Sequence, residues 1–152
     1  MPSILLPVPN HKQVGRYNCL PACVVMVLAY YGINTTEDAV AQQLGTTEYG
    51  TPAGRLLRLS ISKRTVALGP SSLEILRASL LAGNPVIALV NTQFLDYWHE
   101  ETAHAVVVVG FDDTGVLLND PAFDDAPKHA SIDGFLAAWG EYDFQSAVFV
   151  ER

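Results

Sequence analysis

Apolar and polar residues follow a helical pattern in the first half of the chain and a strand-like pattern in the second half. Residues 20–31, L-P-A-C-V-V-M-V-L-A-Y-Y, are apolar on every side of the predicted helix, so the rest of the chain must enclose it. Asn18 is a good N-cap, Pro21 suits the first turn, and Gly32 is expected to end the helix in a left-handed conformation. The pattern therefore predicts a central buried helix near the N-terminus.

Further helices are predicted after this one. Thr35 or Thr36 precedes E-D-A-V-A-Q-Q-L, and Gly45 ends that amphipathic segment. A capping box formed by Ser71 and Glu74 predicts a helix that continues through residue 81. Between these two, Thr51-Pro52 is expected to begin another helix, whose inner face would consist of Leu56, Leu57, Leu59 and Ile61.

Strand patterns dominate the remaining chain. Residues 86–90, V-I-A-L-V, form a short β-branched run typical of a buried strand. Residues 104–111 and 116–120 flank the turn sequence D-D-T-G and predict a hairpin, and residues 146–150 are expected to close the sheet. Helices come mainly first and strands mainly last, which indicates an α+β fold with a mainly antiparallel sheet, built as a single domain over residues 1–152.

Composition and charge narrow the function classes. Apolar residues make up 49% of the chain, which is typical of a folded domain, and a net charge of −7 argues against a nucleic-acid partner. The longest apolar run is shorter than the roughly 20 residues of a membrane-spanning helix. The first ten residues hold three prolines and no Lys or Arg, a poor signal peptide, so we expect a cytoplasmic protein without membrane insertion.

Two cysteines are the first candidates for chemistry. Cys19 and Cys23 lie one helical turn apart, which is a poor arrangement for a disulfide. A thiolate at the start of a helix is stabilised by the helix dipole and by unpaired N–H groups, so Cys19 is the candidate nucleophile. Cys23 lies a full turn inside the apolar helix, and we interpret it as a core residue.

The predicted hairpin supplies a base and a partner for it. His104 opens the first strand, where a substrate can reach it, and Asp120 ends the second strand. The two could therefore lie on neighbouring strand ends, where the carboxylate would orient the imidazole. Four other acids of this region are alternatives, but they lie at the turn or beyond the strand: Asp112, Asp113, Asp124 and Asp125. Nothing visible in the sequence orients the other histidines, His11, His99 and His129.

Gln13 lies six residues before Cys19, where its side-chain amide would complete an oxyanion hole with a backbone N–H of the helix. Taken in order, Gln13, Cys19, His104 and Asp120 make the set of an activated thiol. The spacing of His and Cys does not make a zinc site, and no cofactor is expected.

Three segments resemble the papain-like peptidases of family thirty-nine, which include enzymes that cut double-glycine leader peptides from bacteriocin precursors. These segments are Q-V-G-R-Y-N-C-L-P-A-C-V-V-M-V-L-A-Y-Y-G, H-A-V-V-V-V-G-F-D and L-N-D-P. The L-P-V-P arm before Gln13 is similar to stand-alone members of that family. Two positions depart from the pattern, because Asn18 stands where many members have Asp and Leu20 where many have Gly.

The resemblance implies a papain-like fold and a cysteine peptidase acting on a peptide or leader-peptide substrate. Leu20, Tyr97 and Trp98 are expected to contact the substrate, the latter two from the long loop over residues 92–103. Leader-cleaving members of the family are often fused to a membrane-spanning exporter and its ATPase. This chain has no spanning helix and no P-loop, so an exporter would be a separate partner, as would a precursor peptide. Two alternatives use the same fold, namely a module that binds peptides without cutting them and another thiol acyl transferase or amidase.

Overall fold

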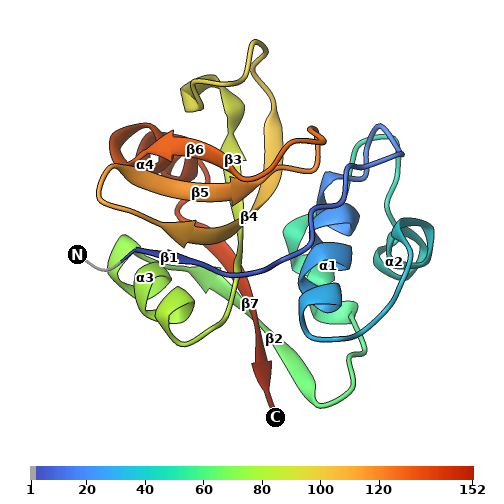
Figure 1. Ribbon diagram of the computed structural model, residues 1–152. Coiled ribbons are helices and arrows are strands. Elements are labelled where there is room, and N and C mark those ends of the chain that lie inside the picture. The colour runs from blue at the N-terminus through green and yellow to red at the C-terminus, as the bar shows by residue number, and fades with distance from the viewer. Residues whose placement is uncertain (1–2) are drawn as a thin grey trace.

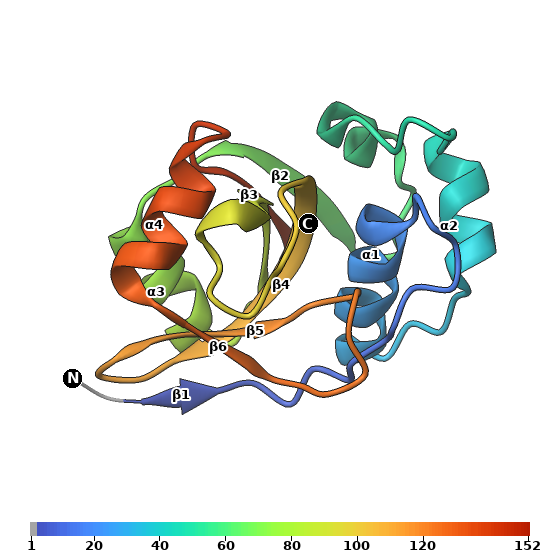
Figure 2. The same cartoon turned by 90° about the horizontal axis from the view of Figure 1, so that it is seen from above.

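The computed structural model describes residues 3–152 and divides into a helical half and a sheet half (Figure 1). The helical half holds α1 (Cys19–Tyr30), α2 (Glu37–Leu44) and the 3-10 helix η1 (Ala53–Arg58). The sheet half holds the β-sheet with α3 (Leu73–Leu81) and α4 (Ile132–Gly140) packed on it. Figure 1 and Figure 2 both place α1 and α2 on one side of the molecule and α3 and α4 on the other.

Within residues 3–152, seven strands form one sheet in which every pairing is antiparallel. Their hydrogen-bonded order is β2-β7-β3-β4-β5-β6, and β1 pairs with β4. The predicted α+β fold with a mainly antiparallel sheet is therefore confirmed. The strands are β1 (Ile4–Leu5), β2 (Arg64–Pro70), β3 (Val86–Asn91), β4 (Ala103–Phe111), β5 (Gly115–Asn119), β6 (Lys128–Ser131) and β7 (Gln145–Glu151), and a short 3-10 helix η2 (Thr92–Phe94) follows β3.

Helix α1 is the buried central helix that its apolar sequence predicts. Most of its residues are inaccessible to solvent, and it packs against β4 of the sheet and against α2. Gly32 adopts φ 81°, and Gly32 and Ile33 donate backbone hydrogen bonds to the last turn, so the helix ends as predicted. Asn18 occupies the N-cap position, but its side chain makes no capping hydrogen bond. Across residues 3–152, no helix combines the length and the hydropathy that a membrane crossing requires.

The predicted boundaries of α2 are correct, but those of η1 and α3 differ from prediction. In α2, the Thr36 hydroxyl accepts the Ala39 N–H, and Gly45 ends the helix at φ 68°. Residues 53–58 form a 3-10 helix in which Leu57 is 64% exposed, so its place on the inner face was wrong. The tighter 3-10 turn rotates successive side chains differently from an α-helix. At α3 the capping residue is Ser72 and not Ser71, because the Ser72 hydroxyl accepts the Ile75 N–H.

The N-terminal arm ties the two halves together. Its first strand lies against β4, and a methyl group at Gly110 would overlap the Ile4 carbonyl, so the glycine permits this close approach. The arm then crosses from the sheet toward α1 (Figure 2). Along this path the Asn119 side chain donates to the Val8 carbonyl at 2.9 Å, and the Gln13 N–H donates to the Pro121 carbonyl at 2.7 Å.

Candidate active site

Cys19 is the first residue of α1 and lies where the helical half meets β4 of the sheet half. Burial raises the pKa of its thiol, but hydrogen bonding to His104, the charge of that imidazole and the backbone groups of Ala105 and Leu20 lower it further. The net pKa of the Cys19 thiol lies below its ordinary value of 9.0. Such a thiol is ionised at a lower pH than an ordinary cysteine and is therefore a better nucleophile near neutral pH.

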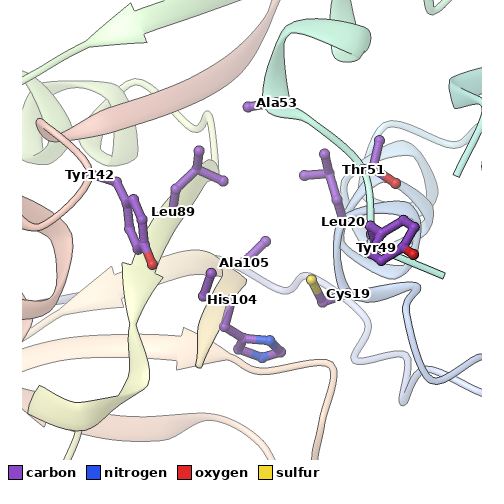
Figure 3. Close-up of a pocket in the computed structure, with 11 residues that line it drawn as sticks. Cys19, Leu20, Tyr49, Thr51, Ala53, Leu89, His104, Ala105 and Tyr142 are labelled. Carbon is purple, nitrogen blue, oxygen red and sulfur yellow. The ribbon is translucent and has the colours of Figure 1, made fainter. Parts of the chain in front are cut away.

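His104 is the second residue of β4 and is only 8% exposed. Burial lowers the pKa of its imidazole, but the hydrogen bonds to Asp120 and Cys19 raise it to about 9. Its Nε2 lies 2.7 Å from the Asp120 Oδ1, so that ring nitrogen serves the carboxylate and Nδ1 is left for the sulfur. Figure 3 shows the Cys19 sulfur and the His104 ring facing each other. Together they favour a thiolate–imidazolium pair.

Asp120 directly follows β5 and is fully buried. Besides His104, its Oδ1 accepts the Ala122 N–H at 2.9 Å, and its Oδ2 accepts the Tyr97 hydroxyl and the Trp98 indole N–H at 2.8 Å each. Burial raises the pKa of this carboxyl, yet the His104 hydrogen bond and charge lower it further, and the net pKa is below its ordinary value. An ionised carboxylate is thus held rigidly behind the imidazole.

Tyr97 and Trp98 have their polar ends directed to Asp120, a contact that the sequence analysis did not anticipate. Burial raises the pKa of the Tyr97 hydroxyl well above its ordinary value, so this group is a proton donor to the carboxylate at every physiological pH. The Trp98 ring lies edge-on to the His104 ring, with 4.9 Å between the ring centres, and it also lines the hollow beside Cys19. Both residues therefore support the imidazole and its carboxylate, whatever they contact in a substrate.

Gln13 lines the same hollow as Cys19 and His104. Its amide Nε2 donates to the Gly15 carbonyl at 2.9 Å and to the Arg16 carbonyl at 3.3 Å. The side-chain amide therefore lies near Cys19 but is hydrogen-bonded within its own loop. An oxyanion would have to compete with these two carbonyl groups for the amide protons.

An apolar cavity of about 180 Å³ opens beside Cys19 (Figure 3). Leu20, which is almost fully buried, lines it together with Leu89 of β3 and Ala105 of β4. Figure 3 shows the Tyr142 ring and Leu89 on one side of this cavity, and Leu20 with Thr51 on the other. The cavity lies between the helical and sheet halves, and Cys19 and His104 are part of its lining.

A second hollow of about 630 Å³ meets the first at Cys19 and His104. Its lining is more polar and includes Arg16, Glu48 and Glu100. Tyr49 belongs to both walls and is 91% exposed, so it stands at the rim between the two spaces. A peptide chain laid across Cys19 would therefore meet an apolar space on one side and a charged space on the other.

The remaining candidates lie elsewhere. Asp112 accepts the N–H groups of Thr114 and Gly115 within the hairpin turn, and Asp125 pairs with Lys128. His11 and His129, for which the sequence indicates no partner, both have one in the structure: His11 contacts Glu37 at 2.9 Å, and His129 contacts the Thr114 hydroxyl at 2.8 Å. No group of three or more His, Cys, Asp or Glu side chains within residues 3–152 is placed to hold a metal ion.

With this geometry described, comparison with known proteins identifies the family. The family described as "Peptidase_C39 like family" matches residues 5–147, nearly the whole chain. The chain belongs to that family. Two relatives share 32% identity with it, namely uncharacterized proteins of Methanothermobacter marburgensis and Methanothermobacter thermautotrophicus. The alignments cover 73% and 72% of this chain and 70% and 69% of the relatives.

Solved structures of C39-like peptidase domains share the fold. A Bacillus anthracis protein classed as a C39-like peptidase superposes with a TM-score of 0.84 at 21% identity, covering 100% of this chain and 99% of the other. The double glycine motif protease of an AMS/PCAT transporter, solved with its leader peptide, gives 0.74 at 20% identity, covering 97% and 94%. The peptidase domain of Streptococcus ComA gives 0.75 at 18% identity, covering 94% and 98%. At these identities the likeness establishes the fold alone.

Proposed function

We propose that this protein is a cysteine peptidase in which Cys19 is the nucleophile, His104 the acid–base residue and Asp120 the residue that orients it. The observation that carries the proposal is the continuous chain of contacts from the buried Asp120 carboxylate through His104 to a thiol of lowered pKa. Membership of the C39-like family supports peptide-bond hydrolysis as the reaction.

The geometry suggests the following sequence of steps. The Cys19 sulfur attacks the scissile carbonyl carbon, and the electron pair of the C=O bond moves to the oxygen. The Leu20 N–H, which faces the sulfur, is a donor near the developing oxyanion, and the Gln13 amide could join it by releasing a loop carbonyl. His104 donates its proton to the leaving nitrogen as the C–N bond breaks. Water then attacks the thioester, giving a proton to His104 and releasing the thiolate.

The apolar cavity indicates what the substrate presents near the scissile bond. Leu20, Leu89 and Ala105 enclose a space large enough for an aliphatic side chain, and filling it would remove apolar surface from water. We therefore propose a peptide with an apolar side chain close to the cleaved bond. One structural neighbour is a double glycine motif protease solved with a leader peptide, which supports a peptide substrate in general. We further propose a cytoplasmic location, with an exporter or a precursor peptide as a separate partner.

Peptide-library profiling of the wild type and of Cys19→Ala tests this proposal. We expect the wild type to release new peptide termini, with aliphatic residues enriched within about three positions of the cut, and Cys19→Ala to release none. Binding without cleavage would support the alternative of a non-cutting peptide module, and the joining of two peptides or loss of a side-chain amide would support an acyl transferase or amidase.

Reactivity of the thiol gives a test without a substrate. Iodoacetamide near pH 6 should alkylate Cys19 much faster than Cys23, because burial raises the pKa of the Cys23 thiol well above its ordinary value. Equal rates for the two cysteines would contradict an activated thiol.

A further inference from the structure

A second buried carboxylate lies behind the helical half of the site. Glu37 is the first residue of α2, is only 6% exposed, and takes no part in the triad. Its oxygens accept the Val14 N–H at 2.9 and 3.1 Å and the Gly15 N–H at 2.7 Å. They also accept the Asn18 side-chain N–H at 2.8 Å, and His11 Nε2 lies 2.9 Å away.

These partners lie within residues 11–18, the segment that leads directly into Cys19. Residues 14–18 connect Gln13 to the first turn of α1, and within this loop the Asn18 N–H and the Gln13 amide both donate to the Gly15 carbonyl. The Asn18 amide donates to Glu37 and makes no capping bond to α1. A methyl group at Gly15 would overlap that amide, so the glycine leaves room for the contact. The loop is therefore shaped around the Glu37 carboxylate.

The carboxylate is ionised in this setting. Burial raises the pKa of Glu37, but the hydrogen bonds from Gly15, Asn18, Val14 and His11 lower it further, and the net pKa is below its ordinary value. Hydrogen bonds to a charged acceptor are stronger than those between neutral groups, and backbone N–H groups cannot move away without moving the loop. An amide in place of the carboxylate would accept fewer of these bonds and would direct N–H groups at other donors.

We propose that Glu37 is a positioning residue that holds residues 14–18, and through them Cys19 and Gln13, in register with His104. The proposal rests on the proposed function only in that the loop carries the nucleophile. Such a residue acts on the rate of the chemical step, because misplacing reacting groups by about 1 Å can lower a rate about a hundredfold. Apart from Cys19 and Leu20, the apolar cavity is formed by segments outside this loop, so it should bind a substrate side chain much as before. Arg16 of the loop lines the second hollow, so any change in KM should come from that side.

The test compares Glu37→Gln with Asp38→Asn. Asp38 lies in the same turn of α2 and is exposed, so its variant makes the same chemical change without touching the loop. We expect Glu37→Gln to lower kcat by about tenfold to a hundredfold, with KM changed by less than about threefold. The pH profile of Cys19 alkylation should move toward that of an ordinary thiol by about one pH unit. Asp38→Asn should change neither quantity.

A second variant covers the case in which Glu37→Gln fails to fold at the assay temperature. Asn18→Ala removes the side-chain donor to Glu37 without adding a charge beside Cys19, so it should lower kcat and shift the alkylation profile in the same direction, by less than Glu37→Gln. A folded Glu37→Gln protein, or a folded Asn18→Ala protein in that case, with a wild-type kcat and alkylation profile would overturn the proposal. Alkylation needs no peptide, so a wild type that alkylates rapidly but cuts nothing would contradict the peptidase function while leaving Glu37 still testable.

Discussion

Two buried carboxylates lie on opposite sides of the site, and each positions a different kind of group. Asp120, on the sheet side, receives three side-chain partners and one backbone N–H, and so fixes the direction of an imidazole. Glu37, on the helical side, receives two backbone N–H groups and two side-chain partners, and so fixes the path of a loop. Hydrogen bonding to a buried carboxylate can therefore orient a side chain on one side of the site and a backbone segment on the other side.

We expect the largest effect from replacing Cys19, which lies where the helical half meets the sheet half. Cys19→Ala should lower kcat by about a thousandfold or more, because the nucleophile is lost, while circular dichroism and the melting temperature stay close to those of the wild type. Cys23→Ala is the matched control: it removes a thiol from the buried core, at a cost of about 1 kcal/mol in unfolding free energy, and should leave kcat unchanged. An unfolded Cys19→Ala protein would instead indicate a structural role.

The next largest effect is expected on the sheet side, from replacing Asp120. In Asp120→Asn the imidazole loses its charged partner and its preferred tautomer, so kcat should fall by roughly a thousandfold or more, as in related triads. The hairpin turn offers a matched variant, Asp112→Asn, which changes a carboxylate that contacts the turn residues Thr114 and Gly115 and the side chain of His129. Full activity in Asp120→Asn would assign the orienting role to another group.

The pH dependence of kcat/KM should distinguish the role of Asp120 from that of Glu37. The Cys19 thiolate forms as pH rises through a pKa below 9.0, and the His104 imidazolium is lost as pH rises through about 9, so kcat/KM should describe a bell between these limits. Because Asp120 raises the pKa of His104, Asp120→Asn should move the alkaline limb to lower pH. Glu37→Gln should move the alkaline limb less than Asp120→Asn does, because Glu37 acts on the pKa of His104 only through the position of Cys19. An equal shift of that limb in both variants would remove the distinction between the two carboxylates.

The smallest effect should come from one partner of Asp120. Tyr97→Phe removes the hydroxyl that donates to Oδ2 but keeps the ring beside Phe123, and the Trp98 N–H still donates to the same oxygen. A hydrogen bond to a charged acceptor is worth about 2 kcal/mol, and the remaining Trp98 donor offsets part of its loss, so kcat should fall by about tenfold or less. Tyr30→Phe provides the comparison, since its hydroxyl donates to the Gly83 carbonyl away from the site. It should lower the melting temperature without lowering kcat.

Much of the architecture was predictable because local pattern and tertiary structure agree. The enclosed helix α1 follows from an apolar surface on all sides, and the hairpin β4–β5 from two apolar runs around a D-D-T-G turn. The 3-10 conformation of residues 53–58 and the pairing of β6 were not predicted, because short segments take their conformation from their neighbours.

The residues of the site also differ in how far the sequence predicts them. Cys19, His104 and Asp120 could be chosen from the sequence because each lies at the end of a strongly patterned element. Glu37 could not, since an acid in the first turn of a helix is ordinarily explained by the helix dipole and the cap.

Periodicity along the chain is enough to predict the buried helix and the antiparallel hairpin, and it places Cys19, His104 and Asp120 at the ends of these elements. What surrounds these three residues depends on tertiary structure, because it brings Tyr97 and Trp98 to Asp120 and residues 14–18 to Glu37. Buried donors and acceptors must find partners, and which partners are within reach depends on how distant segments pack.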